Sequence, residues 1–284
     1  MKRVLITGMG SYLGSHLEKF MNEQPEAFQV TVMDVSDEDW KRRNFSCFDS
    51  VVHVAGIAHQ METLENAKQY FQVNCELATD VAQKAKAEGV KQFVLFSTMS
   101  VYGLTQGRIT PFTSVKPKTY YGKSKFQAEQ NIVPLGDENF HVAILRPPMI
   151  YGKGCKGNYP KLSQLLQRLP AFPKVRNQRS MLYVDRCSSF VGSLVASGEG
   201  GLFFPQNKEY VSTDALALEI AKAHGKHLWQ PGGFGWVLRF LARCSRVISK
   251  VFGSLTYDMD MSRAFPDPEE LSFAETIRRT EEGA

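Results

Sequence analysis

Two ionisable side chains four residues apart give the first indication of chemistry in this sequence. Tyr121 and Lys125 are spaced so that a helix places them on one face, one turn apart. A neighbouring cation favours the phenolate form, so we expect it to lower the pKa of Tyr121 from its ordinary value of about 10. The pair is therefore suited to moving a proton at a substrate hydroxyl.

The rest of the sequence predicts the elements that position this pair. Short apolar runs alternate with helical patterns, which is typical of a parallel sheet covered on both faces. The predicted strands are 4–7, 29–34, 51–55, 92–97, 141–146 and 202–204, and the predicted helices are 12–22, 67–88, one through Tyr121 and Lys125, 184–196 and 213–224. We therefore expect an α/β fold of the Rossmann type, with a doubly wound parallel sheet.

The second half of the chain is less regular, because Pro and Gly are dense over 147–173. We expect a dinucleotide-binding domain over residues 1–150, to which 181–200 returns. Residues 151–284 otherwise form a smaller substrate-binding lobe in this prediction. No long flexible linker separates the two parts, so the lobe is expected to be interleaved with the first domain.

The turn after the first predicted strand is rich in glycine. Glycine lets the backbone approach a pyrophosphate, and the helix N-terminus that follows offers free N–H groups and the positive end of a dipole. The spacing is close to T-G-x-x-G-x-x-G with a serine in the middle, and an ordinary strand-to-helix turn is the alternative. The cofactor-binding residues predicted here are Gly8, Gly10, Ser11, Tyr12, Leu13 and Gly14.

An acidic residue ends the second predicted strand. Asp34 lies 20 residues after Gly14, where a carboxylate can bind both hydroxyls of an adenosine ribose and repel a 2′-phosphate. This favours NAD(H), while the nearby Arg42 and Arg43 keep NADP(H) open. The alternative for Asp34 is a turn-forming residue at a strand end.

Smaller features follow the later strands. Ala55 and Gly56 offer a backbone surface without bulky side chains, against which a cofactor can lie. Asn74 falls inside a helical pattern and is either a buried polar tie to a strand or a surface residue. Hydroxyl residues gather at the end of strand 92–97, where loop capping is the alternative to catalysis.

Length and composition exclude several other classes of protein. The chain has 284 residues, with 43% hydrophobic and 22% charged residues and a formal net charge of +5, which is ordinary for a globular protein large enough to bury a core. The five cysteines are scattered without a C-x-x-C, so we expect reduced thiols, no metal site and a cytoplasmic location. We see no nucleic-acid motif, signal peptide or membrane-spanning stretch.

Several motifs in this order resemble one family. The sequence is similar to the extended short-chain dehydrogenase/reductases, and within them to the NAD-dependent sugar-nucleotide epimerase/dehydratases of bacterial surface-polysaccharide type. The similarity covers about the first 200 residues. Its motifs are Thr7-Gly8 through Gly14, His53-Val54-Ala55-Gly56, Phe96 through Gly103, Tyr121-x-x-x-Lys125 and Arg146-Pro147-Pro148-x-x-Tyr151-Gly152.

The resemblance implies catalytic roles for three residues. Tyr121 is the expected general acid and base at a sugar hydroxyl, Lys125 the residue that binds the nicotinamide ribose and lowers the tyrosine pKa, and Thr98 the hydroxyl that binds the same sugar oxygen. The resemblance also places Ser97 and Pro148 beside the cofactor. It implies NAD as cofactor and a UDP-sugar as substrate.

Further residues are expected to bind the substrate. Arg179 matches the arginine that clamps the nucleotide diphosphate in this family, and a planar guanidinium suits phosphate oxygens. Ser100 and Asn158 are also expected at the substrate, and Lys161 belongs either there or to a solvated basic loop. Arg146 is expected to anchor a strand end, and Tyr102 to pack.

Two departures from the family pattern narrow the prediction. Dehydratases of this family place an Asp-Glu pair directly after the catalytic threonine, whereas Met99 and Ser100 stand here, so water elimination is disfavoured. Only 14 residues separate Asp34 from Asp49, where the family usually has a helix and a further strand. This shortening puts the adenine contacts in doubt.

Three functions follow from these expectations. The first is an NAD(P)-dependent 4-epimerase acting at C4 of a UDP-hexose such as UDP-glucose or UDP-GlcNAc, in surface polysaccharide precursor synthesis. The second is a UDP-4-keto-6-deoxyhexose 4-reductase, which would use the same catalytic residues. The third is a non-catalytic nucleotide-binding regulator, which predicts loss of the hydroxyl, tyrosine and lysine set.

Two expectations concern partners. Family analogy predicts a homodimer through paired helices. Residues 234–250 are amphipathic and basic, so they are either an ordinary helix of the substrate lobe or a weak contact with an anionic membrane surface. No nucleic-acid partner is expected.

Overall fold

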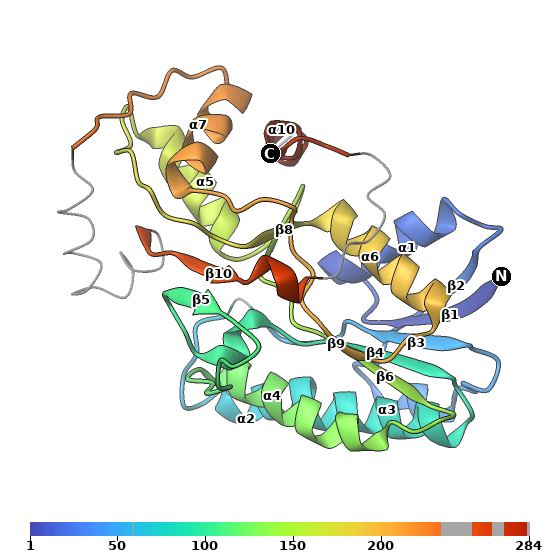
Figure 1. The fold of residues 1–284 in the computed structure, drawn as a ribbon. Coiled ribbons are helices and arrows are strands. Elements are labelled where there is room, and N and C mark those ends of the chain that lie inside the picture. Colours follow the sequence, from blue (N-terminus) through green and yellow to red (C-terminus); the bar gives the residue numbers. More distant parts are fainter. Residues whose placement is uncertain (59, 234–251, 263–269, 283–284) are drawn as a thin grey trace.

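The computed structural model describes residues 1–58, 60–233, 252–262 and 270–282 (Figure 1). Its main sheet has six parallel strands in the order β2-β1-β3-β4-β6-β9. The strands of this sheet are β1 (Lys2–Thr7), β2 (Phe28–Met33), β3 (Ser50–His53), β4 (Gln92–Phe96), β6 (His141–Leu145) and β9 (Gly201–Phe203). The predicted Rossmann-type parallel sheet is therefore confirmed.

Helices cover both faces of this sheet (Figure 1). Along β1, Leu5 faces one apolar cluster with helices α3 and α4, while Val4 and Ile6 face the other cluster with α1 and α6. A strand buried on both faces has to be apolar throughout, which explains the near-continuous runs in the sequence. The covering elements are α1 (Tyr12–Asn22), α2 (Ala67–Phe71), a π-helical turn (Gln72–Glu76), α3 (Leu77–Ala87), α4 (Tyr120–Ile132) and α6 (Val184–Ser197).

A third apolar cluster lies on one side of the sheet and is formed mainly by the later part of the chain. It joins the parallel pair β7 (Met149–Tyr151) and β8 (Met181–Tyr183) to α5 (Asn158–Arg168), α7 (Thr213–Ala223) and α10 (Phe273–Glu281). Helix α6 packs on the main sheet instead, through Phe190, Val191 and Leu194 among others. This arrangement agrees with an interleaved lobe, although the proposed boundaries at 150, 181 and 200 stay a prediction.

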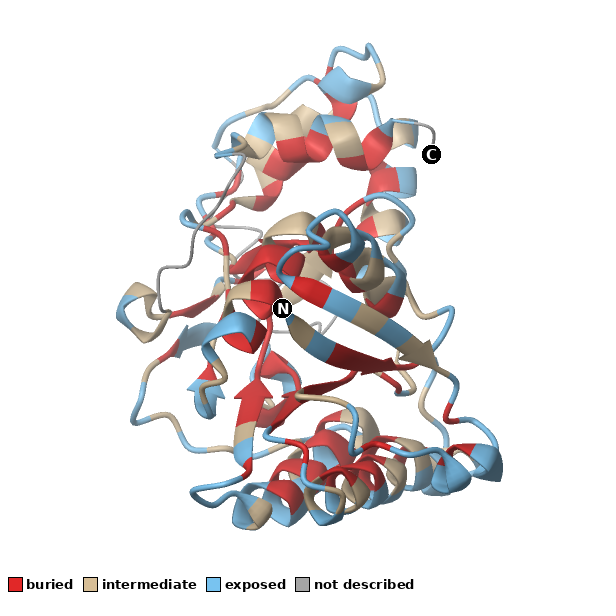
Figure 2. Ribbon diagram, turned by 90° about the vertical axis from the view of Figure 1, so that its right-hand side faces the viewer, coloured by how far each residue is buried: buried red, intermediate tan, exposed pale blue. Residues whose placement is uncertain are grey.

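Short elements connect the two parts. Strand β5 (Gly107–Ile109) pairs in parallel with β10 (Leu255–Tyr257), so a loop of the first half is joined to the end of the chain. The remaining short helices are Glu38–Arg42, Met99–Tyr102, Val133–Leu135 and Met259–Met261. Figure 2 shows that buried residues line the central strands and the helix faces turned toward them.

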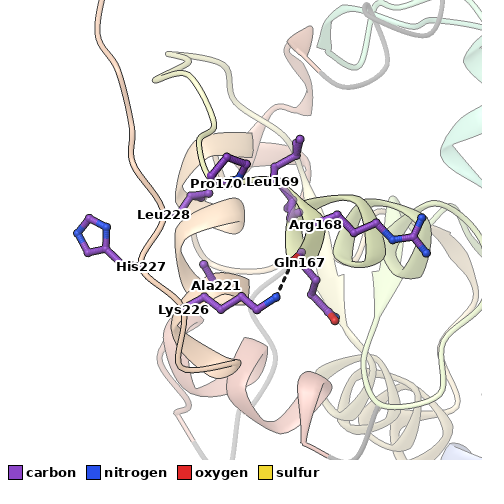
Figure 3. A pocket seen from close by; sticks show the side chains of 9 residues that line it. Gln167, Arg168, Leu169, Pro170, Ala221, Lys226, His227 and Leu228 are labelled. Carbon is purple, nitrogen blue, oxygen red and sulfur yellow. Dashed lines mark hydrogen bonds between the residues drawn. The ribbon is translucent and has the colours of Figure 1, made fainter.

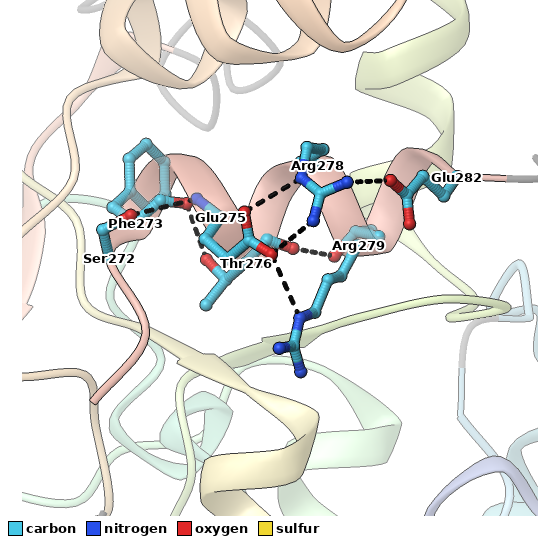
Figure 4. A network of polar contacts seen from close by, with 8 residues as sticks. Ser272, Phe273, Glu275, Thr276, Arg278, Arg279 and Glu282 are labelled. Carbon is cyan, nitrogen blue, oxygen red and sulfur yellow. Dashed lines mark hydrogen bonds and ion pairs between the residues drawn. The ribbon is translucent and has the colours of Figure 1, made fainter. Parts of the chain in front are cut away.

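The C-terminal helix α10 carries its own polar network. Glu275 pairs with Arg278 and Arg279 on the exposed side, and Arg278 also pairs with Glu282 (Figure 4). On the inner side, the Glu281 carboxylate accepts hydrogen bonds from the hydroxyls of Tyr159 (2.7 Å) and Ser163 (2.8 Å) on α5. The network fixes α10 against the lobe.

Candidate active site

The first turn of the fold places backbone N–H groups at one end of the sheet. Gly8 and Gly10 adopt positive φ angles of 107° and 71°, which favour glycine. Ser11 caps helix α1, because its Oγ accepts a hydrogen bond from the Gly14 N–H (3.1 Å). The Ser11 hydroxyl, for which a phosphate contact was considered, is thus already engaged in shaping the turn.

The turns after β1 and β3 meet where the strand order reverses. The chain runs from β1 to β2 on one side and then to β3 on the other, and such a switch point is where ligands bind in open α/β sheets. A Cβ on Gly8 would lie 2.8 Å from the Ala55 nitrogen, so no larger residue fits there. A Cβ on Gly10 would meet nothing within 4 Å, which leaves its backbone open to a ligand.

Asn74 lies at the centre of the site and is fully buried. Its side chain accepts from the Ile57 N–H (2.7 Å) and donates to the Ile57 carbonyl (3.0 Å) and to the Ser124 hydroxyl (3.1 Å). Of the two alternatives for this residue, the buried tie is correct, although it ties a loop after β3 and not the strand itself. The π-helical turn around it widens the helix at this point.

Tyr121, Lys125 and Thr98 come together at the same end of the sheet. Tyr121 and Lys125 lie on the first turns of α4, which Thr119 caps by accepting from the Gly122 N–H (3.0 Å). The Thr98 side chain, two residues after the end of β4, lies close enough to Tyr121 to favour its phenolate form. A Cβ on Gly56 would lie 3.1 Å from Lys125 Nζ, so the lysine amine reaches the loop after β3.

Thr98 also has the structural role that was considered as its alternative. Its Oγ1 accepts from the Ser100 N–H (3.1 Å) and so caps the short helix Met99–Tyr102. Ser100 itself is exposed. Capping and contact with Tyr121 are therefore made by one hydroxyl, which fixes its position.

Burial sets the protonation of the pair. It raises the pKa of Tyr121, and the nearby Thr98 side chain opposes this rise. The expected lowering by Lys125 is not found, because burial is the largest cause of the shift and Lys125 is not among its causes. Burial lowers the pKa of Lys125 to about 8, and Glu129 raises it. His53 is fully buried and burial lowers its pKa to about 3, so it is neutral at pH 7.

A buried ion pair between Glu129 and Arg146 holds together the elements that carry Lys125 and Thr98. Glu129, four residues after Lys125, accepts two hydrogen bonds from the Arg146 guanidinium and one from the Ser97 hydroxyl. Arg146 also donates to the Tyr102 hydroxyl (2.9 Å), and its carbonyl accepts from the Tyr257 hydroxyl (2.8 Å). These contacts join the ends of β4 and β6 to α4, so Arg146 is the expected anchor and Tyr102 packs as predicted.

A second carboxylate holds the start of α4. The two oxygens of Glu62 accept from the backbone N–H groups of Tyr120 (2.8 Å) and Tyr121 (3.0 Å). The sequence interpretation missed Glu62 and Glu129. The spacing of four between Lys125 and Glu129 is a sequence signal from which Glu129 could have been found. The contact of Glu62 with Tyr121 spans 59 positions of sequence, and no local pattern indicates it.

The other side of the pocket is more open. Asp34 is exposed directly after β2, and hydrogen bonds from the backbone and side chain of Ser36 lower its pKa, so it is ionised. No strand forms between β2 and β3, a segment that the structure describes throughout, and β2 is an edge of the sheet. The predicted shortening of the adenine side is thus present.

The predicted substrate residues are less closely grouped. The Arg179 guanidinium is partly buried and donates to the Gly253 carbonyl (2.9 Å), and burial lowers its pKa. Asn158 and Lys161 are exposed on the first turns of α5, apart from the contact that Arg179 makes with Gly253. Pro148 is buried between β6 and β7.

Tyr12, one of the predicted cofactor-binding residues, is the first residue of α1, and its role stays a prediction. Within the part of the chain that the structure describes, its buried hydroxyl and the His53 Nε2 have no hydrogen-bond partner, while His53 Nδ1 lies 2.8 Å from the Thr7 hydroxyl. Among the described residues there is no cluster of metal-binding side chains and no helix able to cross a membrane. The basic stretch 234–250 lies outside the described residues.

One surface cavity lies away from the site, between the end of α5 and the segment after α7 (Figure 3). Lys226 reaches across it to the Gln167 carbonyl (2.6 Å), while the side chains of Arg168 and His227 point away. Nothing in this arrangement connects it with the residues around Tyr121.

Comparison with known proteins now identifies the class. The profile of the NAD dependent epimerase/dehydratase family matches residues 4–185. The chain is 26% identical over 296 residues to UDP-glucose 4-epimerase of Vibrio cholerae, covering 92% of this chain and 89% of that protein. It is 26% identical over 271 residues to N-acetyl-alpha-D-glucosaminyl-diphospho-ditrans,octacis-undecaprenol 4-epimerase of Escherichia coli O157:H7, covering 88% and 77%.

A solved structure shares this fold. The crystal structure of UDP-glucuronic acid 4-epimerase from Bacillus cereus in complex with NAD has a TM-score of 0.76 and 17% identity, covering 99% of this chain and 96% of that one. The family profile spans more than half of the chain. The protein therefore belongs to the NAD dependent epimerase/dehydratase family, as the sequence motifs predicted.

The residues at the switch point fit the cofactor of that family. The open backbone at Gly10 and the capped start of α1, which has no acidic residue in its first turn, suit a pyrophosphate. The ionised Asp34 suits an unphosphorylated ribose. Gly56, which would place a Cβ 2.9 Å from Asn74 Oδ1, leaves room beside Lys125.

Proposed function

We propose that this protein is an NAD-dependent 4-epimerase acting on a hexose that is attached through a diphosphate. The observation that carries the proposal is the position of the Thr98 side chain beside Tyr121, with the buried Lys125 one turn further along α4. A non-catalytic regulator has no need for this set, and maintaining a buried lysine amine without function costs free energy.

The chain supplies proton transfer and orientation. NAD, held by the glycine turn after β1, Asp34 and Lys125, would supply the hydride chemistry at C4 of the sugar, with return of the hydride to the opposite face of the ring. Tyr121 accepts the proton of the C4 hydroxyl as the ketone forms and returns it as the alcohol is restored, so the reaction is balanced without another reagent. Thr98 donates a hydrogen bond to the same oxygen. The Lys125 ammonium binds the ribose next to the nicotinamide ring. Its positive charge also stabilises the phenolate form of Tyr121.

The substrate class is inferred from what the two curated relatives share. One is named for UDP-glucose and the other for a sugar joined by a diphosphate to undecaprenol, so hexose and diphosphate are common to both. Arg179 is the predicted residue that suits a diphosphate, because its guanidinium is always charged and its contact with Gly253 is to a neutral carbonyl. UDP-glucose and UDP-GlcNAc are therefore the first substrates to test.

A 4-ketoreductase is the second candidate, and one observation favours it. The open side at Asp34 suits a cofactor that leaves after each turnover, whereas an epimerase keeps its cofactor. Water elimination is disfavoured, because Met99 and the exposed Ser100 follow Thr98 and neither is an acid.

The experiment assays the purified protein with UDP-glucose, UDP-GlcNAc and a UDP-4-keto-6-deoxyhexose, with and without added NADH or NADPH. Interconversion of C4 epimers without net consumption of nucleotide supports the epimerase. Stoichiometric oxidation of NADH or NADPH supports the reductase, and binding of NAD without turnover of any sugar supports the regulator.

A further inference from the structure

The most exposed large apolar side chains of the described residues lie on two loops beside the candidate active site. Phe112 is 95% exposed, Met61 85% and Leu64 84%. Isolated exposed apolar residues are common on protein surfaces, but the three highest values in one part of the molecule need an explanation. Their exposure also means that they contribute nothing to the core.

Both loops follow strands. Residues 60–64 come after β3, and Glu62 binds the backbone of Tyr120 and Tyr121 at the start of α4. Residues 110–119 follow β5, which pairs with β10 outside the main sheet, and they lead into the same helix. Both loops are thus joined to the start of the helix that carries Tyr121, one through Glu62 and the other through the chain itself.

The charged side chains of the second loop are all positive. Residues 110–119 contain Lys116 and Lys118 and no Asp or Glu, and both lysines are exposed. An exposed aromatic residue followed on the same loop by two exposed lysines suits the interface of an anionic bilayer, where the ring enters the headgroup region and the ammonium groups contact lipid phosphates. Charge complementarity therefore favours a lipid surface over an apolar protein groove.

We propose that residues 60–64 and 110–119 form a membrane-docking rim, and that the sugar reaches the site from an anionic membrane as a lipid diphosphate conjugate. The second part rests on the proposed function. A lipid-linked diphosphate keeps its tail in the bilayer, so an enzyme that acts on its sugar has to hold its active site at the surface. The rim places the entrance of the site there, while Arg179 suits the diphosphate.

Vesicle flotation tests the rim without any assay of activity. We expect the wild-type protein to float with vesicles of phosphatidylcholine and phosphatidylglycerol, less at high salt, and less with phosphatidylcholine alone. The variant Met61→Ser/Leu64→Ser/Phe112→Ser should lose at least about tenfold in vesicle affinity, and Lys116→Gln/Lys118→Gln about tenfold. Trp229→Ser, which changes a 64% exposed aromatic residue on the other lobe, should bind as the wild type does.

Failure of the rim is easy to recognise. The substituted side chains are exposed, so the variants should melt at the wild-type temperature. A wild-type protein that stays below the vesicles, or a triple variant that floats equally well, would overturn the rim. Equal binding to both vesicle types would overturn the role of the lysines.

The substrate part has its own measurement. The wild type is given N-acetylglucosaminyl-diphospho-polyprenol in the same vesicles and, separately, UDP-N-acetylglucosamine in solution. We expect turnover of the vesicle-borne sugar, reduced at least about tenfold in the triple variant, with the rate on the soluble sugar unchanged. Turnover of the soluble sugar alone would overturn the lipid-linked substrate. Absence of both would contradict the proposed function and leave the flotation result standing.

Discussion

At the end of the candidate site that contains Tyr121, Asn74, Lys125 and Thr98 are each no more than 8% exposed, whereas at the other end Asp34 is exposed beside an edge strand. The first region is fixed by two carboxylates, Glu62 and Glu129, that bind α4 and its neighbours. The second has lost the strand that usually lies beyond β2. The comparison indicates that the geometry for chemistry is kept while contacts that only add cofactor affinity are reduced.

The largest expected effect follows from breaking the buried ion pair between Glu129 and Arg146. Glu129→Gln leaves the buried Arg146 without its partner charge, and breaking a buried ion pair costs about 3–5 kcal/mol. Urea denaturation should show a fall of this size in the free energy of unfolding. Glu138→Gln, on an exposed turn, serves as the control and should be within about 0.5 kcal/mol of the wild type. An unchanged stability in Glu129→Gln would mean that the pair does not support the site.

The second largest expected effect follows from removing the charge of Lys125, one helical turn from Tyr121. Lys125→Met should lower kcat at least about a hundredfold, since no cation then favours the phenolate. Steady-state kinetics measures this, with Lys123→Met on the exposed side of the same helix as the matched control. If both variants keep wild-type rates, the lysine has no catalytic part.

The pH profile sharpens the same point. The pKa of Lys125 is lowered to about 8, so the amine is charged below that pH and neutral above it. We therefore expect kcat/KM to fall about tenfold per pH unit above pH 8, and this limb to be absent in Lys125→Met. A wild-type profile that stays flat up to pH 10 would be inconsistent with the role of the ammonium.

The smallest effect belongs to the open end. Asp34→Ala should weaken NAD binding about tenfold or less, because an exposed carboxylate contributes modestly, and should narrow the preference for NAD over NADP. Isothermal titration with both nucleotides measures this, and Asp39→Ala is the control. A loss of several hundredfold would mean that the adenosine end is as well formed as the catalytic end.

Much of this arrangement could be predicted from sequence because it depends on local patterns. The glycine turn after β1 and the spacing of Tyr121 and Lys125 are short-range features, and α1 begins and ends where the pattern predicted. The structure of the second half was harder to predict, since its strands have only three residues each and β5 pairs with β10 from the other end of the chain.

What could not be predicted depends on tertiary contacts. The clamp of Glu62 on α4 joins distant parts of the sequence, and the raised pKa of Tyr121 comes from enclosure that no local pattern reveals. Ser11 illustrates the same limit, because its role as the cap of α1 depends on the folded turn, while its contact with a phosphate stays a prediction. The roles given to Asn158 and Lys161 stay predictions.

The measurement that tests the central claim most directly compares Tyr121→Phe with Tyr120→Phe, its neighbour on the same helix. We predict that Tyr121→Phe loses about a thousandfold or more in kcat for sugar turnover and binds NAD within about threefold of the wild type by titration, since only the proton-transferring hydroxyl is removed. Tyr120→Phe should retain both properties. Wild-type turnover by Tyr121→Phe would contradict the account.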